Sequence, residues 1–231
     1  MHVGELWRFP VKSLRGERVT SVELTDDGVR GDRIAHVRRR QGLVTARTRP
    51  ALLGLSATTG PDGEPLVDGH PVDDPLVTAA LSEAVREPAW AVRYTGRERF
   101  DVLPLLVATD GAIAEFGHDG RRLRPNIVVA GVSELDERHW PSHGLRIGSA
   151  LIGVYSLRER CVMTTVDPDT GERDPDVLRR IHLEFDGRMA LNCWVIEGGE
   201  IRVGDPVELV AMALDLPRSG GWVTGAPYRV G

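Results

Sequence analysis

Apolar and polar residues alternate through much of the N-terminal half of the chain. Residues 18–24 alternate with a period of two, which predicts a half-buried strand. Turn signals such as Asp26–Gly28 separate this segment from its neighbours, and residues 56–75 are rich in Gly, Pro and Asp, as expected for short strands joined by tight loops. Further extended segments are expected at residues 3–9, 34–37, 43–46, 127–130, 150–154, 194–196 and 207–210.

Helical signals are fewer. Asp74 is a suitable N-cap for a helix over residues 75–85, with Pro75 in its first turn. A second helix is expected to begin at Thr109–Asp110 and to end near Gly117, and a short third one to follow Asp174–Pro175. The pattern predicts a mainly β chain with a few helices (α+β), of barrel-like architecture.

Composition excludes several classes of protein. The net charge of −5 gives no electrostatic footprint for nucleic acid. No apolar run approaches the roughly 20 residues that span a bilayer, and the first residues lack the apolar block of a signal peptide. Cys161 and Cys193 form neither a disulfide framework nor a cysteine-rich zinc site. We therefore expect a cytoplasmic protein with no nucleic-acid or membrane partner.

Lys12 is the single lysine among 29 lysine and arginine residues. Such a skew indicates that arginine serves wherever a generic positive charge is enough. The lysine ammonium is a compact point charge, whereas guanidinium is a wide planar fork. Lys12 is thus either a chance survivor or a residue with a role that arginine cannot fill.

Two sequence motifs suggest metal-binding sites, but neither has all the features that such a site requires. The run Asp167–Gly171 resembles a calcium loop, but its glycine falls one place early and no Glu occupies the bidentate position, so we predict a hairpin turn. His139 and His143 have the spacing of a helical zinc pair, but Pro141 lies between them. The sequence also contains neither a phosphate-binding P-loop nor a nucleophile elbow.

A set of cationic, hydroxyl, amide and thiol side chains remains after these exclusions. Cations, hydroxyls and amides hold a phosphate or a polar heterocycle through charge-assisted hydrogen bonds. Nearby cations also favour the thiolate form of a cysteine, which is a nucleophile and a soft metal ligand. The pattern predicts an anionic ligand beside a reactive or metal-bound cysteine; the alternative is solvated arginines and a cysteine that fills the core. The set comprises Lys12, Ser13, Arg33, Thr45, Arg47, Arg124, Asn126, Arg160 and Cys161.

These segments resemble a known family. LWRFPVKS, GVRGDR, LVTARTRP, RLRPNIVVAG, the RCVMTTVDPDTG segment and GGEIRVGDPVEL are similar to MOSC-domain proteins (molybdenum cofactor sulfurase C-terminal), including the mitochondrial amidoxime-reducing component and its bacterial counterparts. The resemblance runs from residue 6 to residue 209. It implies an N-terminal MOSC β-barrel domain over residues 1–97, a MOSC domain over residues 98–212 and a tail over residues 213–231.

The resemblance also implies a molybdenum cofactor, in which a molybdopterin dithiolene holds the metal and Cys161 completes the sulfur ligation. Cys193 matches no ligand position and is expected to be a buried apolar residue. The positions that contact the cofactor's phosphate and pterin are Lys12, Ser13, Arg33, Arg124 and Asn126, with Thr45, Arg47 and Arg160 counted as further cofactor-binding residues.

The chain departs from the family in two places. Residues 101–104 read Asp-Val-Leu-Pro where relatives often carry a Thr-Ser pair, so two hydroxyl contacts to the cofactor are missing or supplied by backbone. Arg158 stands where the family often has a further cysteine, which raises the local positive charge.

The function implied is a molybdenum-dependent oxidoreductase that reduces N-hydroxylated or other N-oxygenated small molecules. Electrons are expected from a separate flavin, haem or iron–sulfur protein, and Glu134, Asp136 or Glu137 are candidate proton donors. The alternative is a sulfur carrier in which Cys161 accepts a persulfide for a metal–sulfur cluster or cofactor. A cofactor-binding protein without turnover is a third reading.

Overall fold

The largest sheet of the molecule has eight strands in the order β17–β13–β14–β15–β11–β12–β1–β2. The structure is a computed structural model, and it describes residues 1–96 and 99–213. Neighbouring strands of this sheet are antiparallel except β11 and β12. The strands are β1 (His2–Arg8), β2 (Glu17–Val19), β11 (Leu105–Thr109), β12 (Ile127–Ala130), β13 (His143–Ile147), β14 (Ala150–Glu159), β15 (Arg188–Glu197) and β17 (Val207–Ala211).

This sheet curls until β1 approaches the chain that leads into β17. Val3 donates its backbone N–H to the Asp205 carbonyl at 2.9 Å, and Val207 donates to the Met1 carbonyl at 3.0 Å. The curl encloses an apolar core that includes Leu6, Leu145 and Cys193, each completely buried. Among the described residues the strands form an open mixed sheet, so the mainly β prediction is confirmed while the barrel is not closed.

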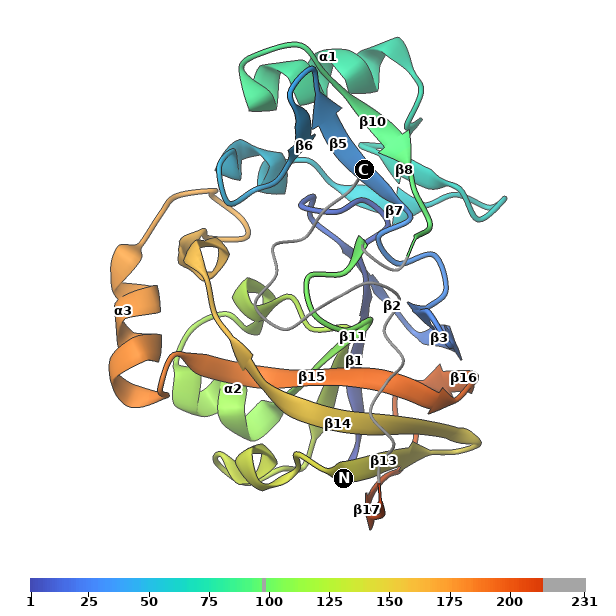
Figure 1. Ribbon diagram of the computed structural model, residues 1–231, viewed down its shortest axis with the longest axis vertical. Coiled ribbons are helices and arrows are strands. Elements are labelled where there is room, and N and C mark those ends of the chain that lie inside the picture. The colour runs from blue at the N-terminus through green and yellow to red at the C-terminus, as the bar shows by residue number, and fades with distance from the viewer. Residues whose placement is uncertain (97–98, 214–231) are drawn as a thin grey trace.

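A second apolar core lies in the upper part of the molecule in Figure 1. Two three-stranded sheets, β10–β5–β6 and β7–β8–β9, surround it together with one helix. A further sheet, β16–β3–β4, covers the lower core. The strands are β3 (Ser21–Thr25), β4 (Gly28–Val29), β5 (Ala35–Arg39), β6 (Gly42–Val44), β7 (Ala57–Thr59), β8 (Pro65–Val67), β9 (His70–Pro71), β10 (Ala89–Arg93) and β16 (Gly199–Arg202).

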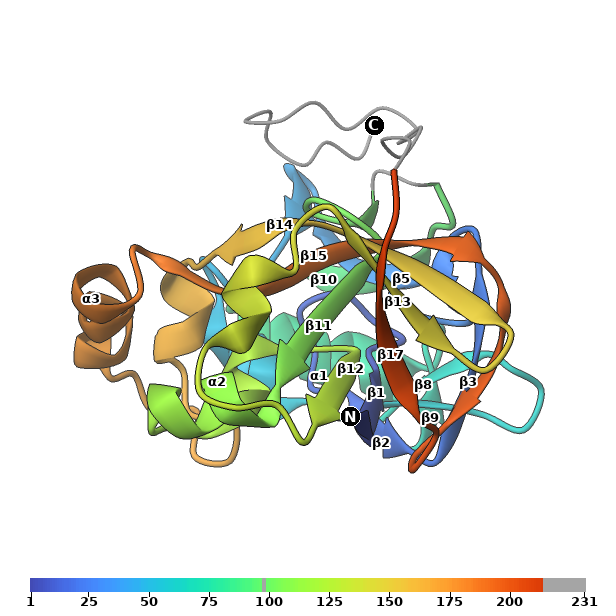
Figure 2. The ribbon, with the colours of Figure 1, turned by 90° about the horizontal axis from the view of Figure 1, so that it is seen from below.

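The three predicted helices are present: α1 (Pro75–Val85), α2 (Asp110–Phe116) and α3 (Pro175–Glu184). Their N-caps follow the sequence signals, because the side chains of Asp74, Thr109 and Asp174 each accept a backbone N–H from the first turn. Helices α2 and α3 pack on a third, smaller core at one flank of the large sheet (Figure 2). Short 3₁₀ helices cover η1 (Pro50–Gly54), η3 (Gly120–Leu123), η4 (Asp136–His139) and η5 (Val162–Thr165).

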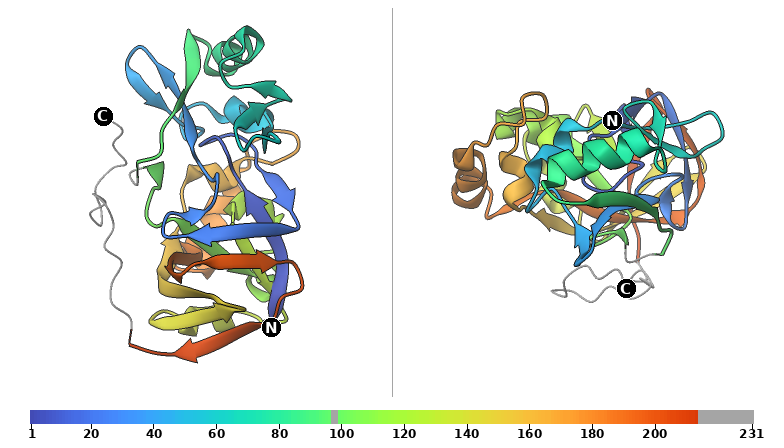
Figure 3. Two further views of the ribbon diagram at one scale, coloured as in Figure 1. Left: turned by 90° about the vertical axis from the view of Figure 1, so that its right-hand side faces the viewer. Right: turned by 90° about the horizontal axis from the view of Figure 1, so that it is seen from above.

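Several segments of the chain pass between the upper and lower cores, and two of them lead to the junction described below. The chain leaving β1 passes from the large sheet into the upper core, where Val11 and Leu14 are completely buried (Figure 3). Val166, directly after η5, packs into the same upper core although η5 follows a strand of the large sheet. Residues from both halves of the sequence therefore meet at the junction between the cores.

Strands β4, β10, β11, β13 and β16 were absent from the prediction. Gly28 was assigned to a turn, and the short runs of β10 and β11 do not distinguish a strand from a helix or loop. The predicted boundary between residues 97 and 98 falls on residues outside the described part, as does the predicted tail beyond residue 213. No helix in the described ranges combines the length and apolar character needed to cross a membrane.

Replacing Gly111 by Ala tests the packing of α2 on the β12 side of the sheet. An added Cβ would lie 2.4 Å from the Val132 carbonyl oxygen and 2.6 Å from that of Glu134, so the backbone would have to move. We expect a loss of about 1–3 kcal/mol in the free energy of unfolding, measured by urea denaturation. Gly54→Ala is the matched control, because nothing lies within 4 Å of its Cβ and a change within about 0.5 kcal/mol is expected. Equal losses in the two variants would contradict this account.

Candidate active site at the junction of the two cores

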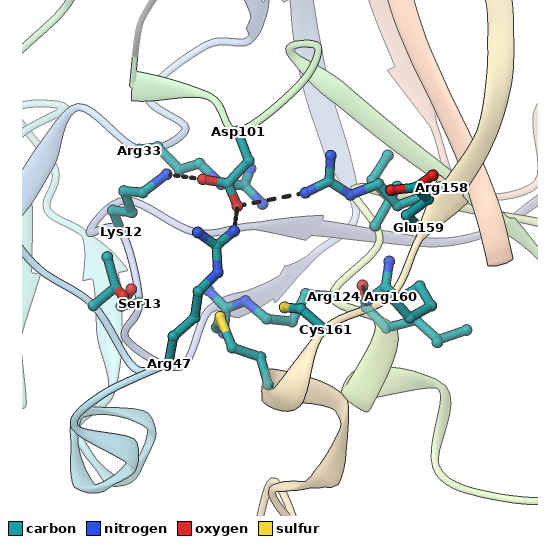
Figure 4. Close-up of a pocket in the computed structure, with 14 residues that line it drawn as sticks. Lys12, Ser13, Arg33, Arg47, Asp101, Arg124, Arg158, Glu159, Arg160 and Cys161 are labelled. Carbon is teal, nitrogen blue, oxygen red and sulfur yellow. Dashed lines mark hydrogen bonds and ion pairs between the residues drawn. The ribbon is translucent and has the colours of Figure 1, made fainter. Parts of the chain in front are cut away.

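A cavity rich in positive charge lies where the two cores meet (Figure 4). Its wall combines the loop after β1, the loop after β6, the segment before β11, the end of η3 and the end of β14. The lining residues are Lys12, Ser13, Arg33, Thr45, Arg47, Asp101, Leu106, Leu123, Arg124, Arg158, Glu159, Arg160, Cys161 and Met163. The structure thus brings together all of the predicted site residues except Asn126.

The Lys12 ammonium is held in the cavity wall by two hydrogen-bond acceptors, and its backbone by a third. Its backbone N–H donates to the Ala35 carbonyl at 2.8 Å, which fixes the loop after β1 against β5. Its Nζ donates to Asp101 Oδ1 at 2.7 Å and to the Arg99 carbonyl at 2.9 Å, and the residue is only 6% exposed. Burial lowers the pKa of Lys12 to about 8, an effect that the attraction of Asp101 only partly offsets. A lysine in this position can hold or release a proton near neutral pH.

Asp101 is the counter-ion of the cavity. Its Oδ2 accepts a hydrogen bond from Arg47 Nη2 at 2.7 Å and lies 3.5 Å from Arg158 Nη2. Burial would raise the pKa of Asp101, but Lys12 and Arg47 together hold that pKa well below its usual range. From the sequence, this position was expected only to lack the hydroxyl contacts of relatives. A lone carboxylate in a segment expected to lie near the bound cofactor was the signal that could have identified it.

The Phe9 ring contacts two guanidinium groups of the cavity. The Arg124 guanidinium lies 4.3 Å and that of Arg33 lies 5.1 Å from the ring centroid, both within cation–π range. Arg33 also pairs with Asp32, a completely buried carboxylate that accepts the Phe9 backbone N–H at 2.7 Å. Phe9 and Asp32 therefore fix the orientation of both arginines.

The backbone of the cavity wall is unusual in three places. Ser13, Arg33 and Arg124 have φ angles of 71°, 53° and 56°, in the left-handed region that side chains other than glycine rarely adopt. Such conformations persist where the surrounding structure imposes them, and they gather at functional sites. All three residues were predicted to bind the cofactor.

Cys161 lies at the end of β14, where it begins η5. Its carbonyl accepts hydrogen bonds from the backbone N–H and the hydroxyl of Thr164, at 3.0 and 2.9 Å. The side chain is half-buried and lies within electrostatic reach of Arg47, Arg158 and Arg160. Positive groups therefore lie near the Cys161 sulfur.

The turn that carries Cys161 is attached to the η3 segment by two arginines. Arg160 Nη2 donates to the Leu123 carbonyl at 2.8 Å. Arg122 donates to the Thr165 carbonyl at 3.0 Å and pairs with Asp167 at 2.8 Å. These contacts join the two sequence segments most characteristic of the resemblance, RLRPN and RCVMTTVDPDTG.

Asn126 lies beside the cavity rather than in its wall. It is 1% exposed, and its side chain donates to the Trp7 carbonyl at 3.4 Å and accepts the Leu106 N–H at 3.2 Å. Asn126 borders an adjoining hollow that shares Arg33, Asp101 and Arg158 with the main cavity. In this structure its amide joins β1 to β11.

Other candidates lie elsewhere in the structure. Cys193 is completely buried in β15, where burial raises the pKa of its thiol, in agreement with the expected apolar role. Glu134, Asp136 and Glu137 do not line the cavity; Glu137 is buried and accepts the Thr109 hydroxyl at 3.3 Å, so the structure does not support their expected role as proton donors.

The predicted hairpin turn is present. Asp167 Oδ1 accepts the backbone N–H groups of Asp169 and Thr170, and Val166 forms an antiparallel bridge with Arg173. Within the described residues, no three His, Cys, Asp or Glu side chains gather in a way that could hold a metal ion.

The donor set of the cavity fits an anionic ligand. Six cationic side chains line it against two acidic ones, of which Glu159 is exposed and, among the described residues, has Arg188 as its ion-pair partner at 3.9 Å. Burial lowers the pKa of Arg124 to about 9 and that of Arg160 to about 10. Nearby carboxylates only partly offset the loss of solvation of these two charges. An anionic ligand with several negative charges would restore the balance.

Because Lys12 is the only lysine of the chain, its titration can be followed directly by NMR with ¹³C-labelled lysine. We expect a pKa of about 8 in the folded chain, against about 10.4 in urea, the ordinary lysine value. The unfolded state binds more protons between these values, so the contribution of Lys12 to stability rises as pH increases through this window. An unshifted folded-state titration would contradict the buried placement of Lys12.

Thiol labelling tests the placement of the two cysteines. We expect the native chain to react with one equivalent of maleimide, because Cys161 is half-buried and Cys193 is completely buried. Cys161→Ala should abolish native labelling, whereas Cys193→Ala should leave it unchanged, with mass spectrometry as the measurement. Labelling of Cys193 in the native Cys161→Ala chain would show that the core is not packed as described.

The chain is similar to several known proteins. The chain is 27% identical to mitochondrial amidoxime reducing component 2 of Macaca fascicularis, over 89% of this chain and 82% of the relative. It is 26% identical to mitochondrial amidoxime-reducing component 1 of Homo sapiens, over 90% and 82% of the two chains. Molybdenum cofactor sulfurase 2 of Culex quinquefasciatus is 32% identical over 39% of this chain and 13% of the relative.

Among solved structures, the YUAD protein from Bacillus subtilis matches 90% of this chain and 94% of its own, with a TM-score of 0.48 and 12% identity. The family model of the MOSC N-terminal beta barrel domain matches residues 1–110, and that of the MOSC domain matches residues 109–208. The two models together span both cores and the cavity between them. The chain belongs to the family of MOSC-domain proteins that carry the N-terminal MOSC β-barrel domain.

Proposed function

We propose that the chain binds a molybdenum cofactor in the cavity between its two cores and reduces N-hydroxylated or other N-oxygenated small molecules there. The observation that carries the proposal is the half-buried thiol of Cys161 in a cavity lined by six cationic side chains. A lone thiolate among cations suits a metal that arrives with its own anionic chelate. The relatedness to amidoxime-reducing components supports this class of substrate.

The residues of the cavity would divide the work of binding. Cys161 would supply one sulfur ligand to the metal, while the cations of the wall would hold the phosphate of the cofactor and hydrogen-bond its heterocycle. Arg47, which contacts both Asp101 and Cys161, would keep positive charge against the ligand sulfur. When bound, the cofactor would supply the two-electron, oxygen-accepting chemistry that amino-acid side chains lack.

Removal of oxygen from a substrate also requires protons and electrons. Of the cationic groups that line the cavity, Lys12 has a pKa of about 8 and can release a proton close to neutrality. A separate electron-transfer protein with a flavin, haem or iron–sulfur centre would restore the reduced state.

A sulfur carrier is the second candidate function. The half-buried thiol of Cys161 is favourable for it, as is the partial match to a molybdenum cofactor sulfurase. In this role the Cys161 thiolate would attack the outer sulfur of a donor's persulfide. A new S–S bond would form at Cys161, the donor's S–S bond would break, and the donor would leave as a thiolate.

Expression in a host that makes the cofactor tests the two functions. We expect close to one molybdenum per chain by elemental analysis, together with reduction of a hydroxylamine or an amidoxime by a chemical electron donor. Cys161→Ala should lose the metal, because its sulfur ligand is gone, while the matched control Cys193→Ala should retain it.

The outcomes of this experiment distinguish the reductase from the sulfur carrier. Metal without reduction of either substrate would overturn the substrate class and keep the cofactor. A persulfide on Cys161 found by mass spectrometry, without molybdenum, would favour the sulfur carrier. Equal metal retention by the two alanine variants would remove Cys161 as the ligand.

A further inference from the structure

A second cavity, of about 350 Å³, adjoins the one that contains Cys161 and shares Arg124 and Met163 with it. Its volume falls within the range of small-molecule binding sites. Strands β1 and β2, the loop between them and the segments around η1, η3 and η5 form its wall. We call it the aromatic cavity, and its lining residues are Trp7, Phe9, Arg15, Gly16, Arg18, Leu53, Arg121, Arg122, Arg124, Pro125, Met163, Val166 and Pro168.

The apolar part of this wall is made largely of ring-shaped side chains that are held in place. Trp7 donates its indole N–H to Glu5 Oε2 at 2.8 Å, which fixes the plane of the indole. Phe9 is 4% exposed, and the backbone of Gly16 packs so closely against its ring that an added Cβ would lie 2.4 Å from Phe9 Cδ1. Two proline rings complete the surface. A preformed wall of this kind favours a planar aromatic group, because aromatic rings pack well against other rings.

All charged side chains that line the aromatic cavity are arginines. Arg18, Arg121 and Arg122 each form an ion pair with an aspartate or a glutamate, at 3.3, 2.6 and 2.8 Å. Arg15 and Arg124 form no ion pair with any residue that the structure describes. The aromatic cavity therefore presents two guanidinium groups whose charge is not neutralised by direct contact.

Arg15 has weak partners within the protein. Its Nη2 donates to the Gly54 carbonyl at 3.4 Å, a long hydrogen bond. Asp169 attracts Arg15 from beyond ion-pair distance, but the Asp169 carboxylate is itself bound by both Nη atoms of Arg121, at 2.9 and 2.6 Å. The guanidinium of Arg15 is thus available to an anion in the cavity.

Arg124 is the deeper of the two unpaired arginines, and it lies at the boundary with the Cys161 cavity (Figure 4). Its guanidinium stacks on Phe9, 4.3 Å from the ring centroid. Asp32 and Asp101 attract Arg124 from beyond ion-pair distance, and burial still lowers its pKa to about 9. An acceptor inside the aromatic cavity would supply the close contact that these carboxylates do not.

We propose that the aromatic cavity binds a planar aromatic carboxylate, with its ring against Trp7 and the prolines and its carboxylate held by Arg15 and Arg124. Guanidinium groups bind carboxylate oxygens through paired, charge-assisted hydrogen bonds. The site is distinct from the cavity that the proposed function assigns to the cofactor, and binding to it does not require the cofactor. Because Arg124 and Met163 line both cavities, a ligand here would lie next to the cavity of Cys161.

Calorimetric titration of the cofactor-free chain with naphthoate tests the proposal. We expect one naphthoate per chain, and at least about tenfold weaker binding of naphthamide, which has the same rings without the charge. Acetate, which has the charge without the rings, should show no measurable binding at the same concentrations, because the ring supplies the apolar contact area.

Two variants separate the contributions of charge and ring. Arg15→Gln should weaken naphthoate binding at least about fivefold and change naphthamide binding by less than about twofold, because it removes a charge-assisted contact. Trp7→Leu should weaken the binding of both compounds by similar factors, because it removes ring contact. Arg40→Gln and Trp90→Leu are the matched controls, since both residues are exposed and line neither cavity.

Lys12→Gln reports which cavity the ligand enters, because Lys12 lines the Cys161 cavity and not the aromatic cavity. We expect its affinity for naphthoate to stay within about twofold of the unaltered chain. A loss equal to that of Arg15→Gln would place the ligand in the Cys161 cavity and overturn the proposal. Absence of naphthoate binding, equal affinity for naphthoate and naphthamide, or unchanged naphthoate binding by Arg15→Gln would overturn it as well. Thermal unfolding of each variant identifies any that fail to fold, and the comparison of naphthoate with naphthamide needs no variant.

The carboxylate has two sources, a substrate or a separate ligand, and the molybdenum-loaded chain distinguishes them. This arm rests on the proposed function and compares an aryl amidoxime with its para-carboxylated form. If the carboxylate belongs to the substrate, Arg15→Gln should raise KM for the carboxylated form at least about fivefold and leave KM for the neutral form unchanged. If it belongs to a separate ligand, both KM values should stay unchanged while naphthoate binding is weakened. A chain that binds naphthoate as expected but acquires neither molybdenum nor reductase activity would remove the proposed function and leave this site standing.

Discussion

The site depends on one half-buried carboxylate, that of Asp101, which lies among several cations. Lys12 and Arg47 come from the first quarter of the chain, Arg158 comes from its second half, and Asp101 lies between them in sequence and in space. Without this carboxylate, the junction between the two cores would hold only positive charge at its centre, and repulsion would oppose the packing of one core against the other. With it, the junction holds together and still keeps a net positive charge for a ligand.

The ends of the helices could be predicted from sequence, because the residues that begin and end a helix act locally. Asp74 with Pro75, and Thr109 with Gly117, act on residues within one or two turns, and the structure has helices at these places. Strand β11 could not be predicted in the same way, since its partners β12 and β15 lie far along the chain and its short apolar run resembles a helix start.

The same contrast holds for the site: sequence motifs could be recognised, whereas contacts between residues remote in sequence could not. Cys161 and Arg124 could be predicted because they lie in distinctive segments. The importance of Asp101 could not, because it arises from contacts with Lys12 and Arg47, which are remote in sequence. The left-handed backbone of Ser13 could not be predicted either. Glycine is the usual residue in this conformation, so a serine in the sequence gives no signal for it.

The placement of β1 has a consequence for when the cavity comes into existence during synthesis. Strand β1 pairs locally with β2, but its other partners are β12 and the residues just before β17. Long-range pairing of this kind delays folding, because the ends of a long loop must meet first. The loop after β1 carries Lys12 and Ser13, and Asp101, which holds Lys12, lies 89 residues further along the chain. The cavity is therefore complete only once segments from both halves of the chain have been translated and packed together.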